Sequence, residues 1–532
     1  MAIAPGRDVD GTGSTGRDVD KGLKAGALGL LSSVVIGISS TAPGYSLAAT
    51  IGFAAAAVGF QTPAILVLAF IPMFCIAYAY RELNAQDPDC GTTFTWAARA
   101  FGPRVGWLGG WGIIVADIVV MANLAQIAGQ YGFLLFGADG LAASTFWVTL
   151  VGSLWIIVLT YICYRGIEIS ARLQFVLLAI EIVALAVFAL VALIKVYSGN
   201  AAAEAVRPAW SWLNPFDVPS FSALSTGVLL AVFIYWGWDT AVACNEETKD
   251  RTTTPGRDAV ISTVTLLGIY LLVAIACISY AGLITLTNPD NKGDVLAALG
   301  DEVLGSTFGK ILILAVLSSA AASTQTTILP TARTTLSMAV HRAIPASFSR
   351  VHPTYQTPAV STIAMGIASV DFYVGLVIVS GNVLADSILA LGLLIAFYYA
   401  LTGYACVWQF RRQLTRSLRD ALVKGILPLA GAVILSLCFY KSAKDMFAED
   451  YGATSFHGVG GVFLLGIGSL LLGVLVMIAC EISRPEFFRK GVGAAVIPPG
   501  DGAAAYPDAA SYSATSSPSA PATDETAKEH QQ

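Results

Sequence analysis

Five acidic side chains interrupt long apolar stretches of this 532-residue sequence, where a carboxyl group can do the most chemistry. These residues are Asp117, Glu181, Asp239, Asp371 and Asp386. A charge in an apolar medium costs several kcal/mol, so each acid is a functional candidate by default. Each could instead be protonated or hydrogen-bonded where two helices meet, and this alternative is favoured for Asp371 and Asp386.

Glu181 and Asp239 are the candidates for proton coupling. A carboxyl group in a dry site can bind and release a proton when water reaches it from alternate sides. Glu181 lies in ARLQFVLLAIEIVALAVF, and Asp239 directly follows an aromatic-rich stretch, FIYWGW. Glu181 could equally attract a cation, and either acid could be structural.

A run of small and hydroxyl residues interrupts the first apolar stretch. A proline removes a helix hydrogen bond and clashes with the preceding turn, so the helix should break at Pro43. Non-helical backbone within a bilayer is tolerated only where protein or a water-filled cavity surrounds it. The break therefore predicts substrate-binding residues, although a simple proline kink remains the alternative. The predicted residues are Ser39, Ser40, Thr41, Ala42 and Gly44.

A second interruption falls at Gly237, which lies among aromatic residues that could frame a ligand or hold a cation. The predicted substrate-binding residues here are Tyr235, Trp236, Gly237 and Trp238. The alternative is an apolar core stripe. Trp236 and Trp238 cannot both point inward on a regular helix, so at least one should face lipid or pack elsewhere.

Two interrupted helices, five spans apart, predict two inverted repeats with a solute site between half-helices. Freed N–H groups and the positive end of a half-helix can hold a carboxylate, and freed carbonyls can hold an amine. The pair of breaks therefore predicts a zwitterion-sized ligand. Ser318 and Ser319 belong to a hydroxyl-rich stretch that could contribute to a cation site, but small-residue packing between helices is the favoured alternative.

The elements that position these residues are membrane-spanning helices. The sequence is 56% hydrophobic and only 12% charged, whereas soluble domains carry roughly 25% charged residues. Segments of about 20 apolar residues cross a bilayer as helices, and the sequence contains 12. They lie at 28–56, 63–80, 105–135, 144–164, 172–195, 221–245, 258–283, 308–337, 358–379, 383–408, 423–441 and 459–480.

The basic residues orient these spans. With both termini cytoplasmic, 24 of the 30 Lys and Arg residues fall in inside segments, as the positive-inside rule requires. The predicted organisation is a cytoplasmic tail at 1–24, a transporter core of ten helices at 25–408, two further helices at 409–482, and a disordered cytoplasmic tail at 483–532. The tail is rich in Ala, Gly, Pro and Ser and cannot bury a core.

Other function classes find less support. All four histidines fall in predicted loops or tails, and neither HExxH nor a P-loop occurs, so an enzyme is not expected. No metal site or cofactor is predicted. No basic stripe exists to bind nucleic acid, and the eight cysteines form no disulfide framework. A non-transporting membrane sensor or scaffold remains the rival class.

Four stretches give the sequence a family resemblance. They are the broken first span, ELNAQDPDCGTTFTWAARAFGPRVGWLGGW at 82–111, FIYWGWDTAVACNEETKDRTTTPGRDAV at 233–260, and TARTTLSMAVHRAIPASFSRVHPTYQTPAV at 331–360. Together they resemble the amino acid-polyamine-organocation permeases, of the bacterial amino acid permease type. The chain departs from this pattern in its first span, where SSTAPG replaces the usual glycine motif.

The resemblance implies an all-α fold of 12 helices, with a LeuT-like 5+5 inverted repeat and discontinuous helices 1 and 6. Some relatives carry a lysine in place of a sodium ion at the position that Glu181 resembles, and in some an acid like Asp239 links protonation to gating. In sodium-coupled relatives, hydroxyls such as Ser318 and Ser319 coordinate the ion together with helix 1.

The expected function is secondary transport of amino acids across the cytoplasmic membrane, coupled to protons. The expected partners are the small-molecule substrate, protons, with sodium as the alternative, and the lipid bilayer. A polyamine importer or an amino acid exchanger is the runner-up.

Overall fold

The computed structural model describes residues 20–289, 291, 293–305 and 308–492, and these are almost entirely helical. The described residues include one small hairpin, formed by β1 (Ser455–Phe456) and β2 (Val459–Gly460). The all-α class predicted from the sequence is therefore confirmed. The predicted tails lie outside the described residues at 1–19 and 493–532.

Long apolar helices make up the bundle, and eleven helical stretches of the described residues are long and apolar enough to cross a membrane. The first stretch, Leu30–Gln86, has 57 residues and covers nearly all of the first two predicted spans. One crossing needs only about 20 residues. Its parts are α1 (Leu30–Ser40), α2 (Pro43–Val58), the 3₁₀ turn η1 (Gly59–Gln61) and α3 (Thr62–Gln86).

The remaining long helices follow in chain order. They are α5 (Pro103–Leu135), α7 (Thr145–Arg165), α8 (Ile167–Ser198), α9 (Phe221–Ile234) with α10 (Asp239–Ala243), α11 (Thr254–Thr287), α13 (Lys310–Val340), α14 (Ala359–Val379), α15 (Gly381–Phe410), a π-helical turn η6 (Ala421–Ile426) leading into α17 (Leu427–Met446), and α18 (Gly461–Ser483). The joint near Gly381 separates two helices, because Ser380 is extended between α14 and α15.

Short helices close the two ends of the bundle. They are α4 (Thr93–Phe101), α6 (Asp139–Ala142), α12 (Val295–Leu304), α16 (Leu418–Asp420), α19 (Pro485–Lys490), and the 3₁₀ turns η2 (Trp210–Leu213), η3 (Pro215–Asp217), η4 (Asn245–Glu247) and η5 (Ala346–Ser349). Residues 485–490 of the predicted disordered tail thus form α19, in which Phe487 and Phe488 are buried.

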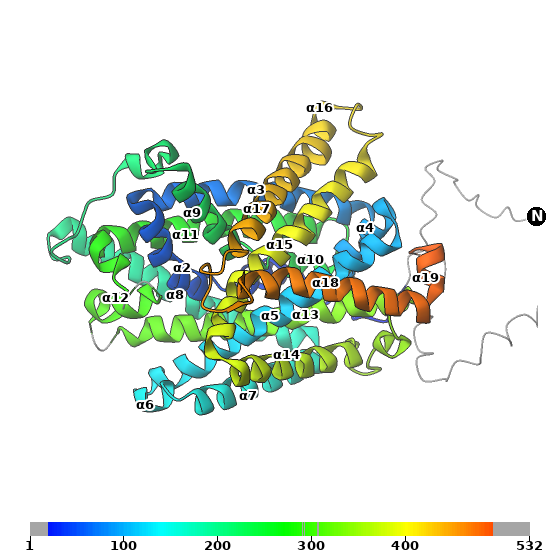
Figure 1. The fold of residues 1–532 in the computed structure, drawn as a ribbon, viewed down its shortest axis with the longest axis horizontal. Coiled ribbons are helices and arrows are strands. Elements are labelled where there is room, and N and C mark those ends of the chain that lie inside the picture. Colours follow the sequence, from blue (N-terminus) through cyan, green and yellow to red (C-terminus); the bar gives the residue numbers. More distant parts are fainter. Residues whose placement is uncertain (1–19, 290, 292, 306–307, 493–532) are drawn as a thin grey trace, which may run out of the picture.

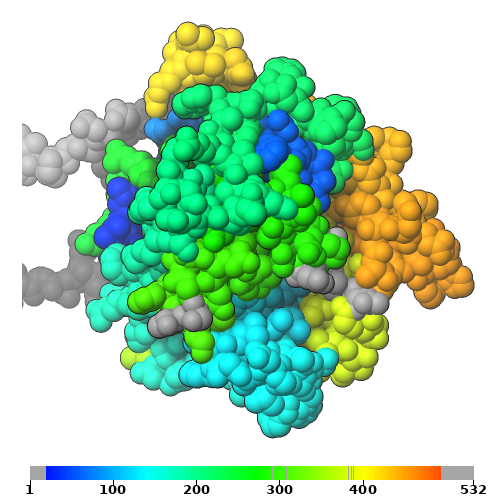
Figure 2. Space-filling model, turned by 90° about the vertical axis from the view of Figure 1, so that its left-hand side faces the viewer, coloured from blue at the N-terminus to red at the C-terminus, as the bar shows by residue number. Residues whose placement is uncertain are grey.

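The two ends of the bundle carry different elements. Figure 1 shows α4 and α19 at one end and α6 and α12 at the other. Figure 2 looks onto the second end, where the segment 199–220 and α12 cover much of the surface. The elements α4 and α19, which the basic residues assign to one side, therefore lie at one end, and α6 and α12, assigned to the other side, lie at the opposite end.

Helix α13 runs through the centre, and helices such as α7, α8 and α18 lie at the periphery. The apolar window of α13 is 78% buried, whereas that of α18 is 22% buried and presents large apolar side chains such as Leu475 and Ile482 outward. The stretch SSAAASTQTT lets other helices approach α13 closely, because small residues let backbones pack together. Hydrocarbon can solvate the apolar outer faces.

Candidate functional site

The first helix breaks where the sequence predicts. Helix α1 ends at Ser40, and α2 restarts at Pro43, the first helical position, where the missing N–H of proline costs nothing. Between them Ala42 adopts a left-handed conformation (φ 46°, ψ 63°), which is uncommon for a residue other than glycine. The backbone is held in this strained form by its buried surroundings.

The second break lies directly against the first. Helix α9 ends at Ile234, and α10 begins at Asp239. Gly237, between them, has φ 119°, and a Cβ atom placed there would lie 2.6 Å from the Ser40 carbonyl oxygen. Only glycine fits so close an approach. The hydroxyls of Ser40 and Thr240 are hydrogen-bonded at 2.8 Å, so the two interrupted helices are bonded where they cross.

Helix α2 receives a carboxylate at its N-terminus. The Gly44 N–H donates to Glu181 Oε1, on α8, at 2.6 Å. The next N–H, of Tyr45, donates to the hydroxyl of Ser319, on α13, at 3.2 Å. An acidic group at a helix N-terminus is stabilised by the helix dipole and by the free N–H groups. Glu181 therefore holds α2 in place.

Asp239 lies at the centre of a tyrosine cluster. It accepts hydrogen bonds from the hydroxyls of Tyr399 (2.8 Å), Tyr398 (3.1 Å) and Tyr80 (3.4 Å). The Trp236 indole N–H donates to the Tyr398 hydroxyl. The cluster links α3, the second break and α15, and it explains how an acid with 7% exposure is accommodated.

A small cavity lies at the crossing of the two breaks. Its volume is about 10 Å³, enough for a single water molecule. The residues that line it are Ser40, Ile113, Asp117, Trp236, Gly237, Asp239, Thr240, Thr327 and Pro330. Two of them are acids and none is basic. Asp117, on α5, accepts a hydrogen bond from the Thr331 hydroxyl.

The residues predicted from the sequence fall into three groups. Ser40, Trp236, Gly237 and Asp239 line the cavity. Gly44, Glu181 and Ser319 meet each other at the start of α2. The others lie outside the cavity lining, namely Ser39, Thr41, Ala42, Tyr235, Trp238 and Ser318. The Ser318 hydroxyl donates to Ala315 O in its own helix.

Both tryptophans of the second break are buried, and neither faces lipid. Trp236 lines the cavity, whereas Trp238 packs edge-on to Tyr80 and beside Tyr399. Both can be buried because the helix is interrupted at Gly237, so the limit that a regular helix would impose does not apply.

Two further acids play no part in this site. The Asp386 carboxylate accepts the backbone N–H groups of Ala453 and Thr454 and so fixes the loop before α18. Asp371 is exposed on α14 rather than placed between helices, because it lies on the outward stripe that contains Ile363 and Ile367. The predicted structural role, that of a hydrogen-bonded acid inside the bundle, thus fits Asp386 but not Asp371.

Sequence reasoning missed Tyr80, Tyr398 and Tyr399, which hold Asp239. It also missed Asp258, which is buried at the start of α11 and accepts a hydrogen bond from Ser262. The tyrosine pair in FYYALTGY and the acid just inside an apolar stretch were the available signals. Neither differs in type from many structural residues.

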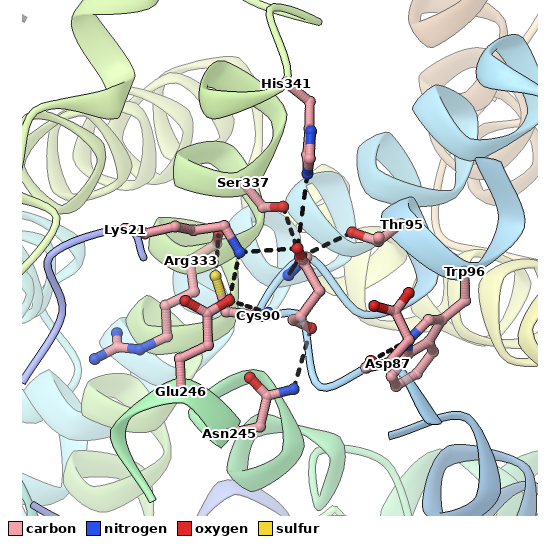
Figure 3. A network of polar contacts seen from close by, with 12 residues as sticks. Lys21, Asp87, Cys90, Thr95, Trp96, Asn245, Glu246, Arg333, Ser337 and His341 are labelled. Carbon is pink, nitrogen blue, oxygen red and sulfur yellow. Dashed lines mark hydrogen bonds and ion pairs between the residues drawn. The ribbon is translucent and has the colours of Figure 1, made fainter. Parts of the chain in front are cut away.

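An ion-pair network closes the end of the bundle that carries α4 (Figure 3). Lys21 is 3% exposed, and its ammonium pairs with Asp89 and Glu246. Asp89 Oδ1 also accepts from the hydroxyls of Thr95 and Ser337. These contacts connect the segment before α1 to the loops that follow α3 and α10.

The charges in this network stabilise one another. Burial opposes the charged form of Lys21, but the groups around it, Asp89 foremost, together outweigh burial and hold the lysine pKa well above its usual value. Burial likewise opposes ionisation of Asp89, but Lys21 and His341 together hold the pKa of that carboxyl well below its usual value. Asp89, Cys90 and Glu246 place ligand atoms within 4.8 Å of one another, but the Lys21 ammonium already pairs with both carboxylates.

A second ion pair lies beside the first. The Arg333 guanidinium, on α13, donates to both oxygens of Glu247, at 2.6 and 2.8 Å, and both side chains are almost fully buried. A bidentate pair of this kind fixes geometry as well as charge. Leu28 joins the same region through two backbone hydrogen bonds, from its N–H to Glu247 O and from the Lys249 N–H to Leu28 O.

Known proteins resemble this chain over most of its length. A family model described as amino acid permease matches residues 28–444. An uncharacterized transporter of Mycobacterium tuberculosis (strain ATCC 25618 / H37Rv) is 27% identical, over 86% of this chain and 93% of its own. A low-affinity putrescine importer of Escherichia coli (strain K12) is 24% identical, over 76% and 86%. An arginine/ornithine antiporter of Latilactobacillus sakei is 22% identical, over 86% and 96%.

Proposed function

Since the chain belongs to the amino acid permease family, we propose that it carries its solute through the cavity where α1–α2 crosses α9–α10. The chain is a transporter of amino acids or organic amines, a class that includes the putrescine importer and the arginine/ornithine antiporter among its relatives. The proposed mode is secondary active transport.

The single observation that carries the proposed site is the contact between the two breaks. Unpaired backbone is tolerated at membrane depth only where it lines a protein interior. Gly237 and Ser40 meet at such a place, and two acids from different helices, Asp117 and Asp239, border the same cavity. Polar groups converging on a cavity between discontinuous helices are the arrangement that transporters use for binding.

The cavity supports an alternating mechanism. At about 10 Å³ it is too small for an amino acid or an amine, so the structure represents a closed form. Solute entry requires the helices around the cavity to separate on one side. The network around Lys21 keeps the end of the bundle that carries α4 closed in that step, because breaking its ion pairs would leave buried charges without partners.

We propose protons as the coupling ion, with Glu181 or Asp239 as the titrating group. Both carboxyl groups are buried beside the helix breaks, since Glu181, on α8, accepts from the Gly44 N–H at the start of α2, and Asp239 begins α10. Sodium would require several preorganised oxygen ligands. The hydroxyl of Ser318 is engaged within its own helix, and that of Ser319 is engaged by Tyr45, which weakens the sodium alternative.

The proposed topology places both termini in the cytoplasm of a cell whose cytoplasmic membrane holds the protein. It rests on the excess of Lys and Arg at the end that carries α4 and α19. The proposed count is 12 spans, ten of which form two inverted repeats of five.

Uptake into proteoliposomes tests the function. The purified full chain, reconstituted with an inward pH gradient, should accumulate radiolabelled lysine, arginine or putrescine above protein-free liposomes, and excess unlabelled solute should block the signal. A sensor or scaffold would give neither accumulation nor exchange. Equal signals with and without protein, for every solute and in counterflow as well, would refute the transporter proposal.

A further inference from the structure

We propose that Glu181 occupies the position that a substrate carboxylate would need, and that the solute is an aliphatic diamine rather than an amino acid. This inference rests on the proposed function and names the substrate class of the same site.

The N-terminus of α2 is the natural receptor for a carboxylate in this fold. A half-helix presents unpaired N–H groups and the positive end of its dipole toward the midplane, where anionic groups bind. Helix α2 has 16 residues and begins within the break that touches the cavity. If the solute were an amino acid, its carboxylate would be expected to bind here.

Every N–H group in the first turn of α2 is already used. Pro43 has none, and the Gly44 N–H donates to Glu181. The Tyr45 N–H donates to the Ser319 hydroxyl, and the Ser46 N–H donates to the Ala42 carbonyl. The carboxylate that this helix end favours is therefore supplied by the protein itself.

Glu181 is built into this position. It is fully buried, and it reaches α2 because Gly44 has no side chain: a Cβ atom there would lie 3.3 Å from Glu181 Oε1 and 3.5 Å from Ser319 Cβ. A solute carboxylate entering the same place would have to displace Glu181 or lie beside it. Two carboxylates side by side in a dry site repel each other strongly.

The cavity differs from the N-terminus of α2, because the groups that line it suit a cation rather than an anion. Among its lining residues, Asp117 and Asp239 are carboxylates, and Ser40, Thr240 and Thr327 add hydroxyls. No lysine, arginine or histidine is part of this lining.

These acceptors match two ammonium groups. One can bind Asp239 and the other Asp117, so that the charges cancel without a buried base. An α-amino acid of the same length would bring a third carboxylate to a site whose lining contains no basic side chain to balance it. The N-terminus of the second half-helix, α10, does not favour the carboxylate of the solute either, because α10 itself begins with the acid Asp239.

Matched pairs of ligands test this inference. Putrescine and ornithine, and likewise cadaverine and lysine, differ only in the carboxylate. Binding to the purified full chain, measured by isothermal titration, should be at least about tenfold tighter for each diamine than for its amino acid. The same order should hold when each unlabelled ligand competes with radiolabelled putrescine uptake.

Two substitutions of Glu181 separate its roles. Glu181→Gln keeps an oxygen that accepts the Gly44 N–H, so the preference for the diamine should remain. Glu181→Ala exposes that N–H, so the ratio of diamine to amino acid affinity should fall by at least about tenfold. Ser319→Ala, which exposes the Tyr45 N–H, should lower the ratio in the same direction and replaces Glu181→Ala if that variant does not fold.

The outcomes separate this inference from the function. If the wild-type chain binds and transports lysine or ornithine as well as the diamines, the substrate class is wrong and the transporter proposal stands. An unchanged ratio in Glu181→Ala and Ser319→Ala would refute the role given to Glu181. Absence of both binding and transport for all four ligands would refute this inference, whereas uptake of another amino acid would keep the proposed function.

Discussion

Gly237 and Ser40 make the closest approach between the two broken helices, and the approach depends on a missing side chain. Gly237→Ala would place a Cβ atom 2.6 Å from Ser40 O at φ 119°, a conformation that costs about 1–3 kcal/mol for other residues. We expect a lower unfolding temperature and at least about a tenfold loss of uptake, measured by thermal unfolding and proteoliposome transport.

Gly268→Ala is the matched control. Gly268 lies in α11, and a Cβ atom placed on it would have no neighbouring atom within 4 Å, while alanine favours helix by up to about 1 kcal/mol over glycine. Its uptake should equal that of the wild type. If Gly237→Ala and Gly268→Ala show the same uptake, the close contact between the breaks is not needed for transport.

Proton coupling is also decided at single residues. Asp239→Asn and Glu181→Gln keep size and hydrogen-bonding oxygens but cannot titrate. Each should abolish uptake driven by a pH gradient while leaving exchange of solute for solute partly intact, as counterflow in proteoliposomes can show. Full proton-driven uptake in both variants, or uptake that requires sodium at constant pH, would contradict the assignment.

The sequence revealed the acids and the breaks better than the groups that surround them. Asp239 is visible because a charge in an apolar stretch is rare. Tyr80 and Tyr399, which hold it, come from helices more than 150 residues away on either side and look like ordinary apolar residues. The pairing of Gly44 with Glu181 joins positions 137 residues apart and could not be read from either segment alone.

At the scale of elements, the segment before α1 is held to the end of the bundle by the ion pairs of Lys21 with Asp89 and Glu246. We call these ion pairs the Lys21 tie. Lys21→Gln removes the charge that Asp89 and Glu246 share, and loss of one partner in a buried pair costs about 3–5 kcal/mol. Lys24→Gln is the control, because its pair with Glu168 is about 40% exposed on both sides and such surface pairs contribute little to stability. Thermal unfolding should separate the two variants clearly.

The pH dependence of this tie follows from its two shifted groups. The pKa of Asp89 is lowered, so its contribution to stability is present above the unfolded value of about 3.9 and is lost as pH falls through the folded value. The pKa of Lys21 is raised, so its contribution is present below about 10.4 and is lost only as pH rises through the folded value.

The tie should therefore hold from about pH 5 to pH 9. Labelling of Cys90, which is buried in the network, by a polar maleimide measures it in a chain whose other cysteines are replaced. Labelling should be slow across this range and fast in Lys21→Gln. A wild-type labelling rate in that variant would show that Lys21 does not hold the segment.

Helical elements could be predicted from apolar length, because a bilayer imposes a minimum span on every helix. The separation of α14 from α15 at Ser380 agrees with the predicted joint. Helix α19 was not predicted, because its six residues are a proline, three charged residues and two phenylalanines. The phenylalanines, Phe487 and Phe488, are buried against Phe94 and other apolar residues of the bundle. Short elements of this kind depend on contacts that no local pattern records.

At the scale of the whole molecule, we expect residues at the two ends to differ in their reaction with a membrane-impermeant label. Phe216 lies in the segment 199–220 and is 93% exposed, whereas Leu418 begins α16 and is 76% exposed. In intact cells that produce the protein, Phe216→Cys should react with a membrane-impermeant maleimide. Leu418→Cys should react only after permeabilisation. The reverse pattern would invert the proposed topology.

Sidedness is predicted from the distribution of Lys and Arg over the whole chain, and it stays a prediction. The number of crossings was harder, since α1, α2 and α3 run on with only η1 between α2 and α3 and together count as one long stretch. The count of 12 and the inverted repeat therefore stay predictions.

The closed cavity of about 10 Å³ also makes the transport cycle sensitive to water activity. Each opening must hydrate a space that now has room for one water molecule, and each closure must expel the added water. An impermeant osmolyte such as sucrose, excluded from the cavity, penalises every water that opening draws in. Solute exchange should slow as sucrose is added on both sides of the membrane, whereas glycerol, which is small enough to enter an open cavity, should slow it less at equal osmolality.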